Sequence, residues 1–173
     1  IGQFKQSDGY AYMCAETLFI RQYQSAWSNA PYPPIFVTVD AVVVQSGHIL
    51  LVRRKARPGE GLLALPGGFV NVDETLKNAC LRELKEETRL KVPLPVLRGS
   101  IINTQVFDKP NRSDRGRTIA HVFHFALPSE HKLPKVKGGS DARDAFWLPL
   151  SKLSSSDMFE DHYYIIQKIL GML

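Results

Sequence analysis

The order of apolar and polar residues along the chain predicts several β-strands separated by turns. Residues 35–44 and 48–55 are rich in β-branched side chains, and the short Gln-Ser-Gly sequence between them is typical of a hairpin. Further strands are predicted in three later segments: 94–107, 118–127 and 145–149. The basic segment 108–117 is predicted to be a loop between two of these strands.

Proline and glycine mark two turns in the first half of the chain. Residues 57–61, with the sequence Arg-Pro-Gly-Glu-Gly, are predicted to form a turn. A strand is then predicted to lead into residues 65–68, with the sequence Leu-Pro-Gly-Gly. This sequence is expected to form a tight loop with accessible backbone amides and carbonyls, because it cannot continue a helix or a central strand.

An amphipathic helix is predicted after this loop. At 100° per residue, apolar and small side chains fall on one face of it: Leu76, Ala79, Cys80, Leu84 and Leu90. Asn71 and Glu74 have the spacing of a capping box, and Asp73 is an alternative N-cap. For Glu74, this capping role competes with any role in a site.

Two more helices and a proline-rich break complete the predicted architecture. Helices are predicted over residues 15–29 and 159–170. Mixed strands with one central and one C-terminal helix predict an α+β layered sandwich. The proline-rich segment 31–34 predicts a boundary, so residues 1–34 are expected to be an N-terminal extension or linker and residues 35–173 a single domain.

Three glutamates lie on the face of the central helix that should be buried. Glu83 and Glu87 fall in the middle of the apolar stripe, and Glu86 falls on its edge. Burial of like charges opposes folding unless a positive group compensates. Residues at i, i+3 and i+4 can converge on one cation, and Mg²⁺ or Mn²⁺ prefers such oxygen ligands. The alternative is a solvated acidic patch on a helix rotated away from the core.

The segment 68–90 resembles the Nudix box, in which specified residues occur in a fixed register. The matching residues are Gly68, Glu74, Arg82, Glu83, Leu84, Glu86, Glu87 and Leu90. The resemblance implies an α+β Nudix fold, an α/β/α sandwich with a mixed β-sheet. It also implies an enzyme that uses Mg²⁺, with Mn²⁺ as an alternative, to hydrolyse nucleoside diphosphates linked to another moiety.

The resemblance further implies a role for each acidic residue of the box. Glu83 and Glu87 would bind the metal together with the carbonyl of Gly67, and Glu86 would be a further ligand or help to activate water. Arg82 would orient the glutamates through charge-assisted hydrogen bonds. The implied catalytic residues are therefore these three glutamates and Arg82.

Arg89 is the one departure from the box, which has glycine at this position. That glycine is expected to serve as a left-handed helix C-cap. Arg89 therefore either adopts the left-handed conformation at a cost of about 1 kcal/mol, or lets the helix continue. On the helical wheel Arg89 points away from the glutamates, so a local change in the helix end is expected and not a loss of activity.

Composition agrees with an enzyme that acts on an anionic small molecule. Of the 173 residues, 44% are hydrophobic, enough for a core, and the formal net charge is +5. The basic residues are spread along the chain, and a phosphorylated substrate explains a basic surface as well as a nucleic acid does, so no nucleic-acid partner is expected. The cysteines Cys14 and Cys80 lie far apart, which favours a reduced cytoplasmic protein. No apolar run has membrane-spanning length, so no membrane partner is expected.

A wider resemblance suggests the substrate. Four segments resemble the C-terminal domain of bifunctional nicotinamide-mononucleotide adenylyltransferase/ADP-ribose pyrophosphatases: 32–41, 81–92, 112–119 and 159–162. The implied reaction is hydrolysis of ADP-ribose to AMP and ribose 5-phosphate, by a domain fused to an adenylyltransferase in a longer protein. The alternatives are hydrolysis of another nucleoside diphosphate derivative or a damaged nucleotide, and a non-catalytic module that senses ADP-ribose.

Substrate-binding residues are expected outside the box. Arginines that could hold phosphates or the terminal ribose are Arg53, Arg54, Arg112, Arg115 and Arg117, with Arg117 favoured because it adjoins a predicted strand. Aromatic residues that could stack on adenine are Phe36, Phe69 and Phe107. For the arginines the alternative is a solvated basic loop, and for the aromatic residues it is packing in the core.

The sequence is compatible with two roles for several other side chains. Asp40 could reach the site or could be an outward-facing strand residue. His162 could reach the site from the last helix or could only make a contact at the N-terminus of that helix. Trp147 is expected in the core. The aromatic residues of the extension could pack on the domain or on a second copy, which would give a homodimer: Phe19, Tyr23 and Trp27.

Overall fold

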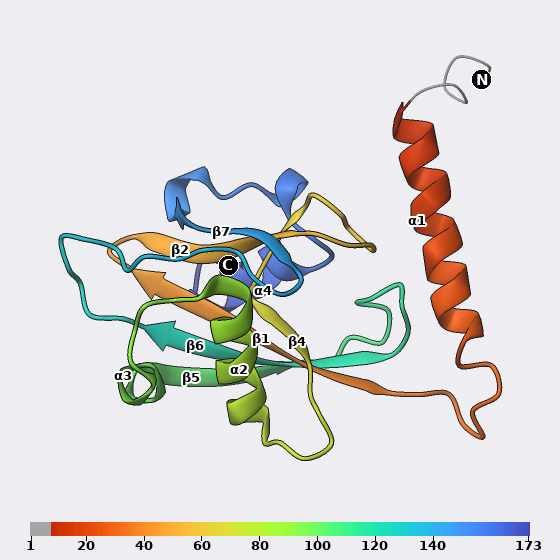
Figure 1. Ribbon diagram of the computed structural model, residues 1–173, viewed down its shortest axis with the longest axis horizontal. Helices are drawn as coiled ribbons and strands as arrows, with labels where there is room; N and C mark the ends of the chain where they lie inside the picture. The colour runs from red at the N-terminus through yellow and green to blue at the C-terminus, as the bar shows by residue number, and fades with distance from the viewer. Residues whose placement is uncertain (1–7) are drawn as a thin grey trace.

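A computed structural model describes residues 8–173, which form a mixed β-sheet with helices on both sides (Figure 1). The helices are α1 (Asp8–Ser25), α2 (Leu76–Thr88), α3 (Leu94–Gly99) and α4 (His162–Ile169). The strands are β1 (Phe36–Gln45), β2 (His48–Arg54), β3 (Leu63–Ala64), β4 (Gly67–Phe69), β5 (Ile101–Phe107), β6 (Thr118–Ala126) and β7 (Ala142–Pro149). None of the helices within residues 8–173 has the length and hydrophobicity needed to span a bilayer.

The sheet is mixed because one of its pairings is parallel. Its strand order is β3-β2-β1-β6-β5, with β4 paired to β1 and β7 paired to β2. β1 and β6 run parallel from the Phe36–Thr118 pair to the Val44–Ala126 pair, and the other pairings are antiparallel. This arrangement confirms the predicted α+β fold with a mixed sheet.

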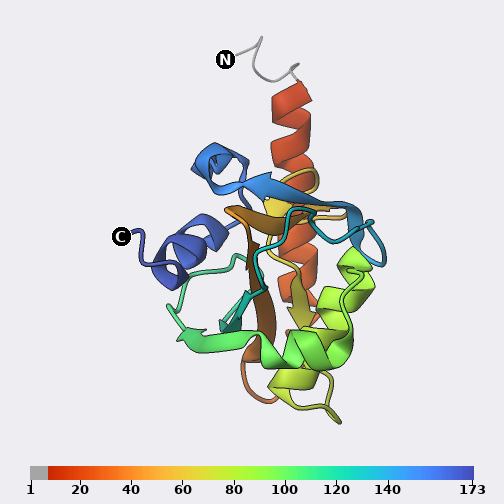
Figure 2. The same ribbon diagram turned by 90° about the vertical axis from the view of Figure 1, so that its left-hand side faces the viewer.

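The two larger hydrophobic cores form on opposite faces of the sheet because successive side chains of a strand point to opposite faces. Val39 and Val43 of β1 pack in the same core as Leu84 of α2. Val42, between them in the strand, belongs to the other core, together with Ile165 of α4. Figure 2 shows the result, with α2 and α4 on opposite sides of the sheet.

Two predicted segments differ from the structure. Residues 94–99 form helix α3 and not the start of a strand, and β5 begins only at Ile101. Pro93 is the N-cap of this helix, and fully buried Leu97 anchors it in the core. The expected loop at 65–68 is also partly wrong, because Gly67–Phe69 pairs with β1 as the short strand β4.

The ends of α2 are set by local contacts. Thr75 is the N-cap of α2 and its side chain accepts a hydrogen bond from the amide of Asn78, so neither Asn71 nor Asp73 is the N-cap. At the other end Arg89 adopts the left-handed conformation, with φ 47° and ψ 32°, and its amide donates to the carbonyl of Lys85. Of the two outcomes expected for Arg89, the strained C-cap is therefore the correct one.

Helix α1 begins earlier than predicted and ends at Ser25, followed by turns to residue 32. It stands at one edge of the molecule and projects beyond the sheet (Figure 1). None of its residues is buried. Its contacts with the rest of the chain are therefore made by half-buried and exposed side chains.

Candidate active site

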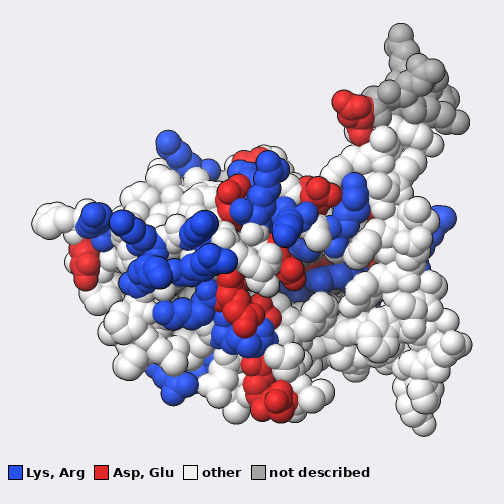
Figure 3. Space-filling model, in the orientation of Figure 1, with Lys and Arg blue, Asp and Glu red and all other residues white. Residues whose placement is uncertain are grey.

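A cleft of about 420 Å³ lies beside α2 and is lined by parts of the chain that are far apart in sequence. Its walls include residues of β1, β2, β4 and α2, the loop between β5 and β6, the segment before α4, and α1. Cavities of this size are typical of small-molecule sites. In Figure 3 the acidic groups lie in the middle of the face that carries α2, with basic groups on both sides.

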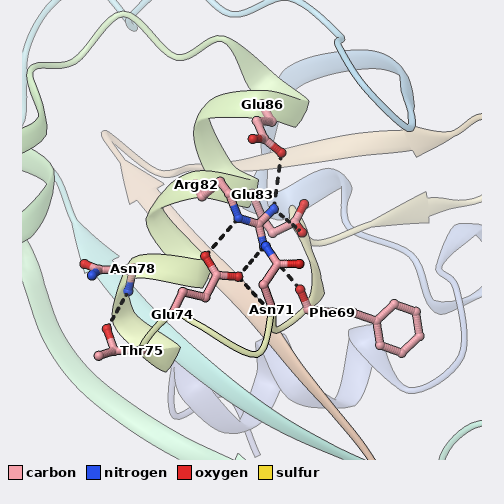
Figure 4. Close-up of polar contacts among 8 residues, drawn as sticks. All are labelled: Phe69, Asn71, Glu74, Thr75, Asn78, Arg82, Glu83 and Glu86. Carbon is pink, nitrogen blue, oxygen red and sulfur yellow. Dashed lines mark hydrogen bonds and ion pairs between the residues drawn. The ribbon is translucent and has the colours of Figure 1, made fainter.

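Arg82 organises the acidic residues of α2 (Figure 4). Its Nη1 donates to Glu83 Oε1 at 2.7 Å and to Glu86 Oε2 at 3.2 Å. Its Nε and Nη2 donate to the two carboxylate oxygens of Glu74 at 3.0 and 2.6 Å, and Nη2 also donates to the carbonyl of Phe69. One guanidinium thus ties the helix to the end of β4 and holds three carboxylates in place.

Glu74 is held by this network and by the loop before the helix. Its Oε1 accepts a hydrogen bond from the amide of Asn71 at 2.9 Å, the backbone half of a capping box. Hydrogen bonds from Arg82 and Asn71 lower the pKa of Glu74 to about 2. Glu74 therefore acts as an anionic partner of Arg82 and also fixes the turn that leads into α2.

Glu83 and Glu87 line the cleft and are largely removed from water. Burial raises the pKa of Glu87 to about 8, although Oε2 accepts a hydrogen bond from the amide of Gly67 at 3.0 Å. Burial also raises the pKa of Glu83, against the opposing effect of Arg82. Two adjacent carboxylates with raised pKa values in a cleft mark a functional site, because their ionised forms need a nearby cation.

The glycines of β4 allow the sheet to approach α2 closely. A Cβ at Gly68 would lie 2.6 Å from Glu83 Oε1, and a Cβ at Gly67 would lie 2.5 Å from Asp40 Oδ1. Any side chain at these positions would displace the carboxylates. Glycine here keeps the backbone of β4 beside the acidic groups, where its carbonyls can serve as oxygen ligands.

A magnesium or manganese ion fits this donor set. Within residues 8–173, no group of three or more His, Cys, Asp or Glu side chains is arranged to hold a metal ion by itself. Glu86, whose side chain is half-exposed, shares Arg82 Nη1 with Glu83, and its expected role as a further ligand stays a prediction. Mg²⁺ usually binds one or two carboxylates and completes its shell with water and substrate phosphates. Glu83, Glu87 and the backbone of Gly67 meet that requirement.

A second charged cluster forms the opposite wall of the cleft. Arg112, whose side chain is 3% exposed, donates through Nε and Nη2 to both oxygens of Asp161 at 2.9 and 2.8 Å. Ser113 donates to Glu160 Oε1 at 2.9 Å. These bonds attach the basic loop 108–117 to the start of α4. Arg115 extends from the loop over the ring of Phe69, with its Cζ 5.3 Å from the ring centroid.

Asp40 and His162 are buried polar groups that reach the cleft. Burial raises the pKa of Asp40 to about 7. Burial and three neighbouring arginines lower the pKa of His162 to about 3. The Nδ1 atom of neutral His162 accepts a hydrogen bond from the amide of Leu65 at 3.0 Å, so this side chain also supports the strand that leads to Gly67.

The predicted substrate-binding residues fall into two groups. Arg54, Arg112, Arg115 and Phe69 line the cleft. Arg54 is half-buried, with its Cζ 4.0 Å from the ring centroid of Phe159 and its Nε bonded to the carbonyl of Pro58. Arg112 is already paired with Asp161, so Arg54 and Arg115 are the cations best placed to contact a ligand.

The second group lies away from the cleft. Arg53 donates to the carbonyl of Gly61 at 2.8 Å, and Arg117 donates to the carbonyl of Asp108. Phe36 packs edge-on against Phe69, with ring centroids 5.8 Å apart, and so supports a cleft residue. Phe107 is buried in the core beneath α4. Trp147 packs against the core beside α2 as expected.

Sequence reasoning did not assign several residues that line the cleft: Phe19, Tyr23, Lys55, Asp141 and Glu160. Burial raises the pKa of Glu160. The PheGluAspHis segment was a signal for Glu160, because it was among the segments that carried the wider resemblance. The remaining residues have no local sequence pattern that marks them, since only the tertiary fold brings them to the cleft.

The cleft and its acidic helix lie in a region that matches a known family. The protein-family model described as NUDIX domain matches residues 34–169 of this chain. The chain belongs to the Nudix family. Helix α1 lies outside the matched region of this Nudix hydrolase.

Within the Nudix family, the chain is similar in sequence to proteins whose names refer to ADP-ribose. An ADP-ribose pyrophosphatase of Methanocaldococcus jannaschii is 37% identical over 131 residues, covering 76% of this chain and 70% of the relative. The ADPR-responsive transcriptional repressor NtrR of Acinetobacter baylyi is 30% identical over 165 residues, covering 92% of this chain and 61% of the relative.

A solved structure shows the same fold over nearly the whole chain. It is a bifunctional NMN adenylyltransferase/ADP ribose pyrophosphatase from Francisella tularensis, complexed with AMP and a Mn ion. The TM-score is 0.95 and the identity 41%, and the match covers 99% of this chain and 51% of that one. The chain therefore spans about half the length of that bifunctional protein, and the predicted resemblance to this group is confirmed.

Proposed function

We propose that this Nudix hydrolase cleaves the pyrophosphate bond of ADP-ribose to give AMP and ribose 5-phosphate, with Mg²⁺ or Mn²⁺ as cofactor. The observation that carries the proposal is the carboxylate pair of partly buried Glu83 and buried Glu87, packed against Gly67 and Gly68 in a cleft that also holds Arg54 and Arg115. The named activity of the M. jannaschii relative supports the choice of substrate.

The reaction adds water across the P–O–P bridge. One phosphorus gains the oxygen of water, and the bridging oxygen leaves with the other phosphate. When bound, the divalent cation would neutralise charge on the pyrophosphate and lower the pKa of a coordinated water. Glu83, Glu87 and the carbonyl of Gly67 would hold the cation, with Glu86 as a further ligand or as the group that activates water.

The remaining residues position the substrate and the carboxylates. Arg82 would orient Glu83 and Glu86 through its hydrogen bonds to both carboxylates. Arg54 and Arg115 would contact the phosphates from the opposite side, where Asp161 already fixes the loop through Arg112. Because Arg54 and Arg115 also lie against aromatic rings, their positions are set before a ligand binds.

The part of the bifunctional relative that this chain does not cover suggests a further proposal about the intact protein. We propose that this domain works in one polypeptide with an adenylyltransferase domain, as in the F. tularensis protein. Both activities would then act on adenine nucleotides.

A product assay tests the proposed reaction. The chain is incubated with Mg²⁺ and ADP-ribose, NADH, a diadenosine polyphosphate or an oxidised nucleoside triphosphate, and products are separated by ion-exchange chromatography. We expect equal amounts of AMP and ribose 5-phosphate from ADP-ribose, a higher kcat/KM than for the other substrates, and no turnover with excess EDTA. Faster cleavage of another substrate would reassign the enzyme, and tight ADP-ribose binding without products would indicate a sensor.

A further inference from the structure

Helix α1 connects the two loops that flank the cleft. On one side Glu16 Oε2 accepts a hydrogen bond from the amide of Gly59 at 2.9 Å, and Glu16 Oε1 forms an ion pair with Arg57 Nε at 3.4 Å. On the other side Gln24 Nε2 donates to the carbonyl of Asp114 at 2.8 Å. The helix is therefore fixed at two points, one in the turn 57–61 and one in the basic loop 108–117.

Between these two points, α1 presents two aromatic side chains to the cleft. Phe19 and Tyr23 are one helical turn apart, lie with ring centroids 6.2 Å apart, and both line the cavity. Tyr23 also packs edge-on against Phe36, which in turn contacts Phe69. A continuous aromatic wall thus runs from α1 to the end of β4, beside the glycines of the acidic site.

The other aromatic ring of the cleft is already covered. Phe159 is 4% exposed, with Arg54 over its ring at 4.0 Å and His162 at a centroid distance of 5.5 Å. Phe69 remains 40% exposed, although Arg115 Cζ lies 5.3 Å from its ring centroid. The aromatic surface open to a ligand is therefore formed by Phe19, Tyr23 and Phe69.

We propose that α1 is the nucleobase-binding wall of the cleft, with Phe19 and Tyr23 as specificity-determining residues for the adenine ring. The proposal rests on the proposed function for its ligand, because the base is the only aromatic part of ADP-ribose. Base–aromatic contacts contribute substantially to nucleotide binding, and a wall that ends beside Gly68 leaves the pyrophosphate next to Glu83. The specificity element would thus lie outside the matched Nudix domain.

The two reaction products separate the two ends of the cleft. AMP carries the base, whereas ribose 5-phosphate carries a phosphate and no base. Dissociation constants for both are measured by isothermal titration calorimetry with Mg²⁺, using the wild type and the variants Phe19→Ala and Tyr23→Ala. The matched control is Leu18→Ala, because Leu18 lies on the same helix and is 57% exposed. The conservative variant Tyr23→Phe keeps the ring.

We expect each alanine variant to weaken AMP binding about tenfold and to leave ribose 5-phosphate binding within about twofold. Leu18→Ala and Tyr23→Phe should bind AMP as the wild type does, and all variants should keep its melting temperature. Unchanged AMP binding in the alanine variants would overturn the proposal. Equal weakening of both products would also overturn it, since α1 would then act only as a structural brace.

Turnover of ADP-ribose by the wild type keeps this test separate from the proposed function. If the wild type does not hydrolyse ADP-ribose, but Tyr23→Ala selectively weakens AMP binding, the nucleobase wall stands and the proposed reaction fails. If the wild type hydrolyses ADP-ribose and the alanine variants bind AMP normally, the reaction stands and the wall fails.

Discussion

Arg82 is the residue on which the geometry of the acidic site depends most. Its guanidinium bonds Glu74, Glu83 and Glu86 at once, and it also reaches the carbonyl of Phe69. A lysine has one ammonium group and cannot reproduce these forked contacts. The positive charge alone is therefore not sufficient to hold the carboxylates in place.

We predict that Arg82→Lys lowers kcat for ADP-ribose by about 10- to 100-fold, the range expected when a group that orients metal ligands is lost. The exposed Lys77, on the far side of the same helix, supplies the control Lys77→Ala. Steady-state kinetics measure both. Full activity in Arg82→Lys would show that the glutamates are positioned without the guanidinium.

His162 makes stability depend on pH in a defined direction. Its pKa is lowered to about 3, by burial first and then by Arg112, Arg54 and Arg115. A lowered pKa means that the unfolded chain takes up this proton and the folded chain does not, so stability is lost as pH falls through the interval from 6.5 to about 3.

We predict that His162→Gln reduces this acid sensitivity, because glutamine can accept the Leu65 amide without titrating. The free energy of unfolding is measured in urea between pH 7 and pH 5 for both proteins. The wild type should lose up to about 1.4 kcal/mol per pH unit more than the variant. Parallel pH profiles would contradict the burial of a neutral imidazole.

At the scale of the elements, helix α2 ends in a strained residue. Arg89 has φ 47°, a conformation in which glycine is not penalised. We predict that Arg89→Gly raises the free energy of unfolding by about 1 kcal/mol. Arg89→Ala is the control, since it removes the side chain but keeps the strain. Chemical denaturation distinguishes them, and equal destabilisation by both changes would refute the explanation.

The same helix shows which features could be predicted from sequence. The positions of Glu83 and Glu87 on the buried face follow from helical periodicity alone, and both line the cleft. Thr75 is its N-cap, although Asn71 and Asp73 are better N-cap residues by intrinsic preference, so local sequence did not identify the cap.

Features that depend on distant contacts were not predictable in this way. Strand β4 exists because Gly67 and Gly68 pair with β1, and glycine carries no local preference for that pairing. The apolar residues at 94–97 fit a strand or a short buried helix, and the buried Leu97 side chain decides for the helix. The same limit applies to Phe19 and Tyr23, which reach the cleft only because α1 is anchored to two loops.

At the scale of the whole molecule, helix α1 contributes less to the hydrophobic cores than the domain that contains the β-sheet. No residue of α1 is buried, so the hydrophobic cores of the described residues do not depend on it. We predict that a protein lacking residues 1–30 stays folded and hydrolyses ADP-ribose with a raised KM. Circular dichroism and steady-state kinetics test this. An unfolded or aggregated product would show that α1 belongs to the structural core or to an interface between copies.

The central claim is that Glu83 and Glu87 of α2 support metal-dependent hydrolysis of ADP-ribose. It is tested most directly by kcat of Glu87→Gln at saturating Mg²⁺, with the exposed Glu130→Gln as a matched control. The account predicts that Glu87→Gln loses about 100-fold or more in kcat while Glu130→Gln keeps full activity. A kcat for Glu87→Gln within about threefold of the wild type would contradict it.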